Sequence, residues 1–205
     1  TLRYLTTLKL GSNRFWGSIP VGLGRATSLQ SLSLSSNNFT GRLPEGLFAS
    51  LRSLVSFLYS GIHGNTGSLP TELFSLPLIE TISLSDSQFS GTIPALNTPM
   101  LQRLSLSTNS LTGTIPPMDS LTILTELILQ NNMLEGTIPS FRECHYLETL
   151  LCQANRLSGD FCALETNTRL REIVLSENSL GGSLCVFAQP VPSLKTLAVS
   201  NNQLF

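Results

Sequence analysis

A single spacing of apolar residues recurs from one end of the chain to the other, and it limits the available folds more than any other feature. Most copies have leucine or a similar residue at the first, fourth and sixth positions, asparagine at the ninth, and Gly-x-(Ile/Leu)-Pro shortly afterwards. In the copy that begins at Leu124, the next leucines are Leu127 and Leu129, and on a short strand the residues between them point to the opposite face. One such strand cannot bury its leucines alone, so the copies are predicted to stack into a solenoid.

The period of the copies indicates the class of solenoid. Intervals of 22 to 26 residues separate the glycines that mark them: Gly17, Gly41, Gly67, Gly91, Gly113, Gly136, Gly159 and Gly182. Leucine-rich repeats have periods of about 20 to 29 residues. We therefore expect an α/β leucine-rich-repeat solenoid, a right-handed superhelix with a parallel β-sheet on the concave face and short 3-10 or irregular segments on the convex face. Residues 1–205 would form one solenoid of about nine repeats. Because the chain starts and stops inside repeats, we expect a fragment that lacks both terminal caps.

The asparagine at the ninth position is interpreted as structural. Its amide can satisfy backbone groups of neighbouring repeats that would otherwise be buried without partners. The expected ladder consists of Asn13, Asn37, Asn109, Asn132, Asn155, Asn178 and Asn202. Ser87 takes this position in the fourth repeat, where its shorter hydroxyl should serve less well. Ile62 takes it in the third repeat, and residues 60–65 are predicted to form a bulge that is either a tolerated insertion or a functional loop.

Composition and motifs exclude several functions. The net charge is −1 and 12% of the residues are charged, so the chain has no basic stripe for nucleic acid or an anionic membrane. No apolar stretch approaches the ~20 residues that span a bilayer. The two histidines, His63 and His145, belong to no catalytic or metal-binding motif. We expect no enzyme activity, no cofactor and no metal.

The Gly-x-(Ile/Leu)-Pro extension carries a more specific resemblance. In the form of residues 17–20, 91–94, 113–116 and 136–139, it resembles the plant-type subclass of leucine-rich repeats. That subclass occurs in the ectodomains of plant receptor-like kinases and receptor-like proteins, in polygalacturonase-inhibiting proteins and in surface antigens of trypanosomatid protists. The resemblance implies an extracellular or cell-surface module that binds peptides, proteins or glycans on its concave side, with coreceptors docking laterally. The paired-cysteine N-terminal cap of the family is absent, and several repeats are shorter than its usual 24 residues.

The cysteines and one sequon bear on the compartment. Cys162 and Cys185 occupy the proline position of adjacent repeats, a separation that a disulfide tolerates, although two free thiols are the alternative. Cys152 replaces an inward leucine and should be a buried thiol, while Cys144 has no obvious partner. Asn38 heads the sequon Asn-Phe-Thr, a site for N-glycosylation in a secreted protein.

The outward positions of the strands change character along the chain. Through the first five repeats they are mostly serine and threonine, whereas later repeats carry an apolar column with charged residues beside it. We predict that this later part binds the partner, although aliphatic residues also simply suit strands. The predicted contact residues are Ile128, Leu151, Val174 and Ala198, with Glu126, Glu148, Arg171, Glu172 and Lys195 at the polar rim.

Three classes of function are compatible with these features. The first is a recognition module of a receptor-like or cell-surface protein, which binds a protein, peptide or glycan and a coreceptor. The second is a secreted inhibitor of a cell-wall-degrading enzyme. The third is a structural or glycan- or ice-facing surface protein, which the early hydroxyl arrays suggest. All three place the chain outside the cell, with any membrane anchor in another segment.

Overall fold

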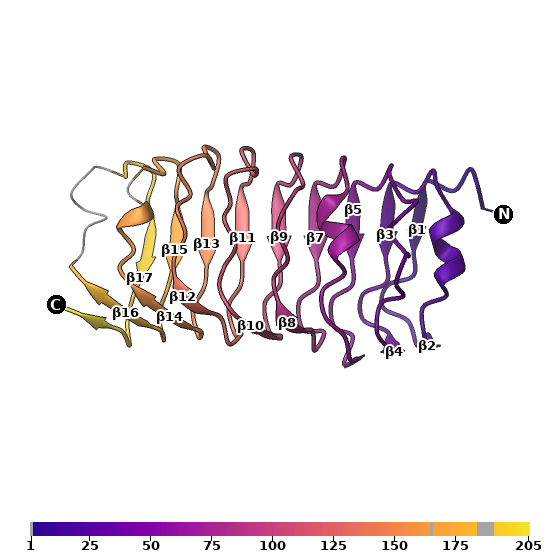
Figure 1. The fold of residues 1–205 in the computed structure, drawn as a ribbon, viewed down its shortest axis with the longest axis horizontal. Coiled ribbons are helices and arrows are strands. Elements are labelled where there is room, and N and C mark those ends of the chain that lie inside the picture. Colours follow the sequence, from indigo (N-terminus) through magenta and orange to yellow (C-terminus); the bar gives the residue numbers. More distant parts are fainter. Residues whose placement is uncertain (1, 165, 184–190) are drawn as a thin grey trace.

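A computed structural model describes residues 2–164, 166–183 and 191–205, and it shows a stack of short strands along one long axis (Figure 1). Nine strands form one parallel sheet in sequence order, and we number the repeats 1 to 9 by them. The strands are β1 (Thr7–Lys9), β3 (Ser31–Ser33), β5 (Ser56–Leu58), β7 (Thr81–Ser83), β9 (Arg103–Ser105), β11 (Glu126–Ile128), β13 (Thr149–Leu151), β15 (Glu172–Val174) and β17 (Thr196–Ala198).

The register of this sheet places equivalent residues beside one another. Leu127 of β11, for example, lies between Leu104 of β9 and Leu150 of β13, and all three side chains are buried. Burial of each inward leucine contributes on the order of 1.5–3 kcal/mol, which no repeat could gain without its neighbours. The predicted solenoid and its parallel sheet are confirmed.

A second row of strands follows the asparagine turn and runs along the lower edge of the stack in Figure 1. Three short parallel sheets make up this row. Their strands are β2 (Trp16–Gly17), β4 (Asn38–Gly41) and β6 (Gly64–Asn65); β8 (Ser90–Thr92) and β10 (Ser110–Thr112); and β12 (Glu135–Thr137), β14 (Arg156–Gly159), β16 (Ser179–Gly182) and β18 (Gln203–Leu204). From the sequence, this stretch is predicted to be a turn and return path, and these strands are not predicted.

The return path contains three short 3-10 helices among the described residues, η1 (Val21–Arg25), η2 (Thr71–Ser75) and η3 (Cys162–Leu164). Pro20 and Pro70 directly precede the first two with φ of −72°. Proline fixes φ near this value, so it directs the chain into the turn that follows. Short helices on the return path agree with the predicted convex face.

The asparagine ladder has the same geometry in repeat after repeat. The amide nitrogen of Asn132 donates to the carbonyl oxygens of Leu106 and Leu129, both at 3.0 Å. Its side-chain oxygen accepts the backbone N–H of Leu111 at 3.1 Å. One side chain thus connects its own repeat to the preceding one through backbone groups that would otherwise lack partners.

Ser87 replaces only part of this function, as predicted. Its hydroxyl contacts the carbonyl oxygens of Tyr59 and Ser85 at 2.8 and 2.9 Å and accepts the Ile62 N–H at 3.3 Å. A hydroxyl has a single hydrogen to share between two carbonyls, whereas an amide nitrogen has two. Repeat 4 is therefore held to repeat 3 by fewer donors than the asparagine repeats have.

The segment 60–65 does not project as a loop. Ile62 and Asn65 are buried, and Gly64–Asn65 forms β6 beside β4. Of residues 60–65, His63 is the one that is mostly exposed, and its Nδ1 lies 3.7 Å from an Asp86 carboxylate oxygen. The amide of Asn65 has no hydrogen-bond partner among the described residues, which costs stability. The extra length of repeat 3 is accommodated inside the solenoid.

Candidate functional site

The outward side chains of the nine-stranded sheet form a continuous surface, which we call the sheet face. In repeats 6 to 9 its central column consists of Ile128, Leu151, Val174 and Ala198, which are register partners on adjacent strands. All four are partly exposed, whereas the apolar residues on either side of them in sequence belong to the core or pack against it. The sequence placed this apolar column correctly, because register partners in a parallel sheet point to the same face.

Charged residues line one side of the apolar column, and two of the carboxylates are already paired. Arg103 Nε lies 3.2 Å from Glu126 Oε1, and Arg171 Nη1 lies 3.1 Å from Glu148 Oε2. Glu172, by contrast, forms no ion pair with any described residue. Among the predicted rim carboxylates, Glu126 and Glu148 are therefore already paired, and Glu172 is available to pair with a basic group of a partner.

Two glutamines line the other side of the column, and neither was predicted from the sequence as a site residue. Gln130 and Gln153 occupy the same position in repeats 6 and 7, and their side-chain oxygens are buried without hydrogen-bond partners in the described part of the chain. Farther along, the hydroxyls of Ser200 and Ser176 lie 3.0 Å apart. The change from serine to glutamine at this position was the signal that could have identified them.

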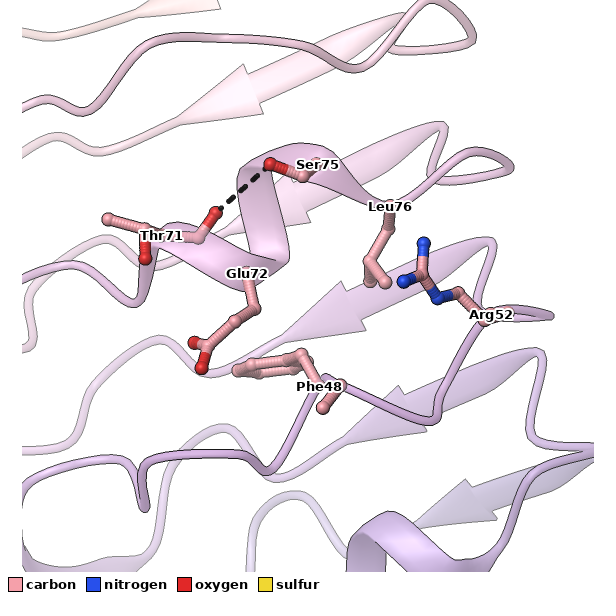
Figure 2. A pocket seen from close by; sticks show the side chains of 7 residues that line it. Phe48, Arg52, Thr71, Glu72, Ser75 and Leu76 are labelled. Atoms are coloured by element: carbon pink, nitrogen blue, oxygen red, sulfur yellow. Dashed lines mark hydrogen bonds between the residues drawn. The ribbon is translucent and has the colours of Figure 1, made fainter.

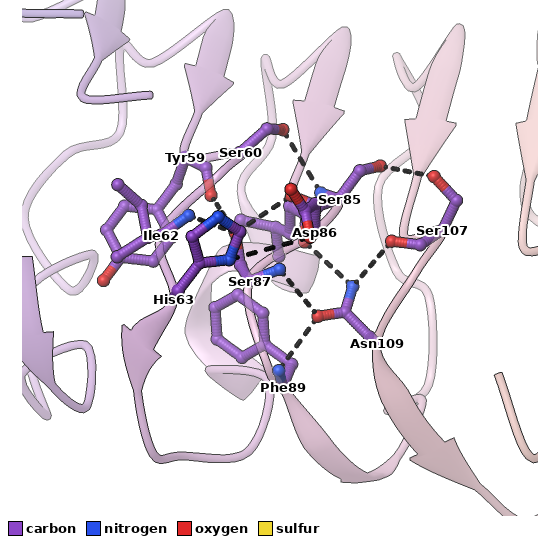
Figure 3. Close-up of polar contacts among 11 residues, drawn as sticks. Tyr59, Ser60, Ile62, His63, Ser85, Asp86, Ser87, Phe89, Ser107 and Asn109 are labelled. Carbon is purple, nitrogen blue, oxygen red and sulfur yellow. Dashed lines mark hydrogen bonds and ion pairs between the residues drawn. The ribbon is translucent and has the colours of Figure 1, made fainter. Parts of the chain in front are cut away.

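The early repeats carry a different surface, a network of serine hydroxyls (Figure 3). The Ser60 and Ser83 hydroxyls lie 2.8 Å apart, and Ser85 contacts Ser105 at 2.7 Å and Ser107 at 2.9 Å. These hydroxyls bond to one another across repeats 3 to 5, so part of their hydrogen-bonding capacity is used within the protein. The hydroxyl array predicted from the sequence is present, but it is internally bonded.

The histidines lie apart from one another in exposed positions. His145 Nε2 is 3.9 Å from a Glu143 carboxylate oxygen, and His63 contacts Asp86 as described above. Across residues 2–164, 166–183 and 191–205, no group of three or more histidine, cysteine or acidic side chains is arranged to hold a metal ion. Within the same ranges, no helix is long and apolar enough to cross a membrane.

A shallow pocket of about 290 Å³ opens on the return side of repeats 2 and 3 (Figure 2). Glu72 and Arg52 flank the buried ring of Phe48 in it, and Leu76 completes its apolar part. Glu72 also accepts the backbone N–H of Gly46 at 3.4 Å, a contact between two return segments. The pocket lies away from the sheet face, and its Glu72 carboxylate links two neighbouring repeats.

The described cysteines have different surroundings. Burial raises the pKa of the Cys152 thiol to about 12, and burial with the nearby charges of Asp119 and Glu143 raises that of Cys144 to about 11. Both are free thiols and stay protonated at neutral pH, as a buried structural cysteine does. Cys162 lies in η3, while Cys185 lies outside the described residues, so the predicted disulfide stays a prediction. Non-reducing peptide mapping tests it.

The predicted glycosylation sequon lies in β4. Asn38 and Thr40 are exposed, and Phe39 between them is buried. The acceptor side chain is therefore on the surface, and its modification stays a prediction.

Sequence and structure comparisons agree with this geometry. The profile of the Leucine Rich Repeat family matches residues 28–49 and 100–119. A search of curated protein sequences finds no match. Together with the solved structures described next, the profile shows that the chain belongs to the leucine-rich-repeat family.

Several solved structures share the fold. The plant peptide hormone receptor RGFR1, solved in complex with RGF2, is 34% identical with a TM-score of 0.86, and the match covers 95% of this chain and 32% of the receptor. The Arabidopsis receptor kinase HAESA, solved with the peptide hormone IDA and the co-receptor SERK1, is 26% identical with a TM-score of 0.79. The match covers 99% of this chain and 38% of HAESA. A plant ice-binding protein is 28% identical with a TM-score of 0.83, and the match covers 98% of this chain and 66% of that protein. The chain thus spans about a third of the length of these two receptors and has the fold of their ectodomains.

Proposed function

We propose that this chain is the recognition segment of an extracellular or cell-surface receptor-like protein, and that the sheet face of repeats 6 to 9 binds a peptide or protein. The observation that carries the proposal is the apolar column from Ile128 to Ala198, held in register beside charged residues. Interfaces place apolar groups at the centre and polar groups at the rim. The similarity to peptide hormone receptors supports a peptide partner, and the HAESA complex supports a coreceptor as a second partner.

The column and the residues on its two sides indicate which chemical groups the partner should carry. An aliphatic or aromatic side chain of the partner would cover Leu151 and Val174, and a basic group would pair with Glu172. The half-buried side chains of Gln130 and Gln153 would form the polar edge on the other side of the column. No catalytic role is proposed for any of these residues.

A pair of matched substitutions tests the location. Leu58 occupies the same column as Leu151 but lies in repeat 3, beside the serine network. Peptides are selected from a displayed random library against the purified chain, and their affinities are measured for the Leu151→Asp and Leu58→Asp variants. We expect Leu151→Asp to weaken binding by about 2 kcal/mol or more and Leu58→Asp to leave it unchanged. Equal losses, or a loss only with Leu58→Asp, would reject the assigned location.

Two other functions call for different measurements. A secreted inhibitor would use the same sheet face against an enzyme, so inhibition of a cell-wall-degrading hydrolase distinguishes it. The similarity to an ice-binding protein and the serine arrays favour an ice-facing surface as a second candidate. Ice-recrystallisation assays test that candidate, and the internal bonding of the hydroxyls leads us to expect little activity.

A further inference from the structure

The only tryptophan of the chain lies next to its only N-glycosylation sequon. Trp16 of β2 and Asn38 of β4 are register partners in adjacent parallel strands, and the Asn38 N–H donates to the Phe15 carbonyl oxygen at 2.8 Å. The backbones of neighbouring strands are about 4.8 Å apart, so two side chains on one face at this position are neighbours.

Both side chains are on the outer face of this row. Asn38 and Thr40 are exposed on either side of buried Phe39, and 82% of the Trp16 surface is exposed. Next to them, the rings of partly exposed Phe15 and buried Phe39 stack with 6.2 Å between centroids and 5° between planes, which ties the two neighbouring segments together. An indole that is exposed to this extent leaves a large apolar surface in water.

We propose that an N-linked glycan on Asn38 packs its first sugar against the indole ring of Trp16. The C–H groups on one face of a pyranose ring form an apolar surface that suits the flat face of an aromatic ring. The sugar would shield Trp16, and the ring would in turn hold the glycan over β2 and β4. On the other side of β4, the register partner of Thr40 is Gly64 of β6. Glycine has no side chain that would compete with the sugar for space.

The modification itself follows the ordinary chemistry of a sequon. An oligosaccharyltransferase joins Asn38 Nδ2 to the anomeric carbon of a lipid pyrophosphate-linked oligosaccharide. The carbon–oxygen bond to the pyrophosphate breaks, the lipid pyrophosphate leaves, and the amide gives up one proton. The inference rests on the extracellular placement proposed above but not on the binding site assigned to the sheet face.

The single tryptophan makes the contact directly measurable. The whole chain is secreted from eukaryotic cells behind a signal peptide, and occupancy of Asn38 is mapped by mass spectrometry after enzymatic deglycosylation. Acrylamide quenching of Trp16 fluorescence is then compared between the glycosylated chain and the Thr40→Ala variant, which keeps Asn38 but has no sequon. A stacked sugar covers one of the two ring faces, so the quenching constant should be about half as large in the glycosylated chain.

A relocated tryptophan is the control. In the double variant Trp16→Phe with Tyr4→Trp, the reporter stands at a position that is 94% exposed and outside the β2–β4 row. Its quenching should not depend on the glycan. An unmodified Asn38, equal quenching of Trp16 with and without the glycan, or equal shielding at position 4 would each overturn the proposal. None of these results would alter the binding measured on the sheet face.

Discussion

The two halves of the sheet face have the same backbone and different surfaces. In repeats 2 to 5, which we call the hydroxyl half, most outward residues are serine or threonine, and in repeats 3 to 5 their hydroxyls bond to one another across strands. Repeats 6 to 9 form the apolar half. The apolar side chains of its central column stay partly exposed to solvent. Inward leucines and the asparagine ladder determine the fold in both halves, so outward residues are free to serve binding. We assign partner binding to the apolar half, because its apolar side chains are exposed to solvent.

The halves also differ in the ladder that supports them. Asn132, Asn155, Asn178 and Asn202 hold the apolar half without interruption. The hydroxyl half has Ile62 and Ser87 at this position in consecutive repeats. A binding surface needs a rigid support, and the complete ladder lies under the proposed site.

The largest expected effect comes from a break in the complete ladder. Replacement of Asn132 by leucine leaves the Leu106 and Leu129 carbonyls and the Leu111 N–H without their side-chain partner. We expect a loss of about 2–3 kcal/mol in the free energy of unfolding. Denaturant melts measure it. An unchanged midpoint would show that the ladder does not stabilise the apolar half.

Alkaline pH should weaken the apolar half through its buried thiols. The pKa of the Cys152 thiol rises from 9.0 to about 12 on folding. Above pH 9 the thiol ionises more readily in the unfolded chain than in the folded one. The stability that the buried neutral thiol contributes is therefore complete below pH 9 and is lost as the pH rises toward 12. At pH 10 this one thiol should cost about 1.4 kcal/mol of stability. Unfolding of the Cys152→Val variant, followed from pH 8 to pH 10, should show a smaller decline. A decline equal to that of the unmodified chain would assign the alkaline loss to other groups, such as Tyr59.

Replacement of Ser87 by alanine tests the weaker ladder of the hydroxyl half. The variant loses contacts with Tyr59 and Ser85 and the acceptor for the Ile62 N–H. We expect a loss of about 1 kcal/mol, which is smaller than that of Asn132→Leu because fewer bonds are broken. The comparison uses the same denaturant melts. If the serine variant loses more than the asparagine variant, the ranking of the two halves is wrong.

The smallest effect is expected at the boundary between the halves. Arg103 in repeat 5 pairs with Glu126 in repeat 6 on an exposed surface. Arg103→Gln should change the free energy of unfolding by no more than about 0.5 kcal/mol, because exposed ion pairs contribute little. Thermal melts at low and high salt check this. A loss above 1 kcal/mol that salt suppresses would mean that the ion pair couples the halves.

The repeat pattern predicted the main sheet, its register and the ladder because these depend on periodic residues such as Leu127 and Asn132. It missed the second row of strands because pairs such as Trp16 and Asn38 are offset by two positions between repeats. The serine network, the Arg103–Glu126 pair and the glutamine oxygens depend on side-chain rotamers, and periodicity carries no information about these. The column from Ile128 to Ala198 was predicted because it is itself periodic.

The most direct test of the central claim converts the apolar half into a copy of the hydroxyl half. The triple variant Ile128→Ser, Leu151→Ser and Val174→Ser changes outward side chains only, so circular dichroism should show an intact fold. Its affinity for a selected peptide, measured by calorimetry beside that of the unmodified chain, should fall about 100-fold or more. Undiminished affinity in the folded triple variant would contradict the assignment of binding to the apolar half.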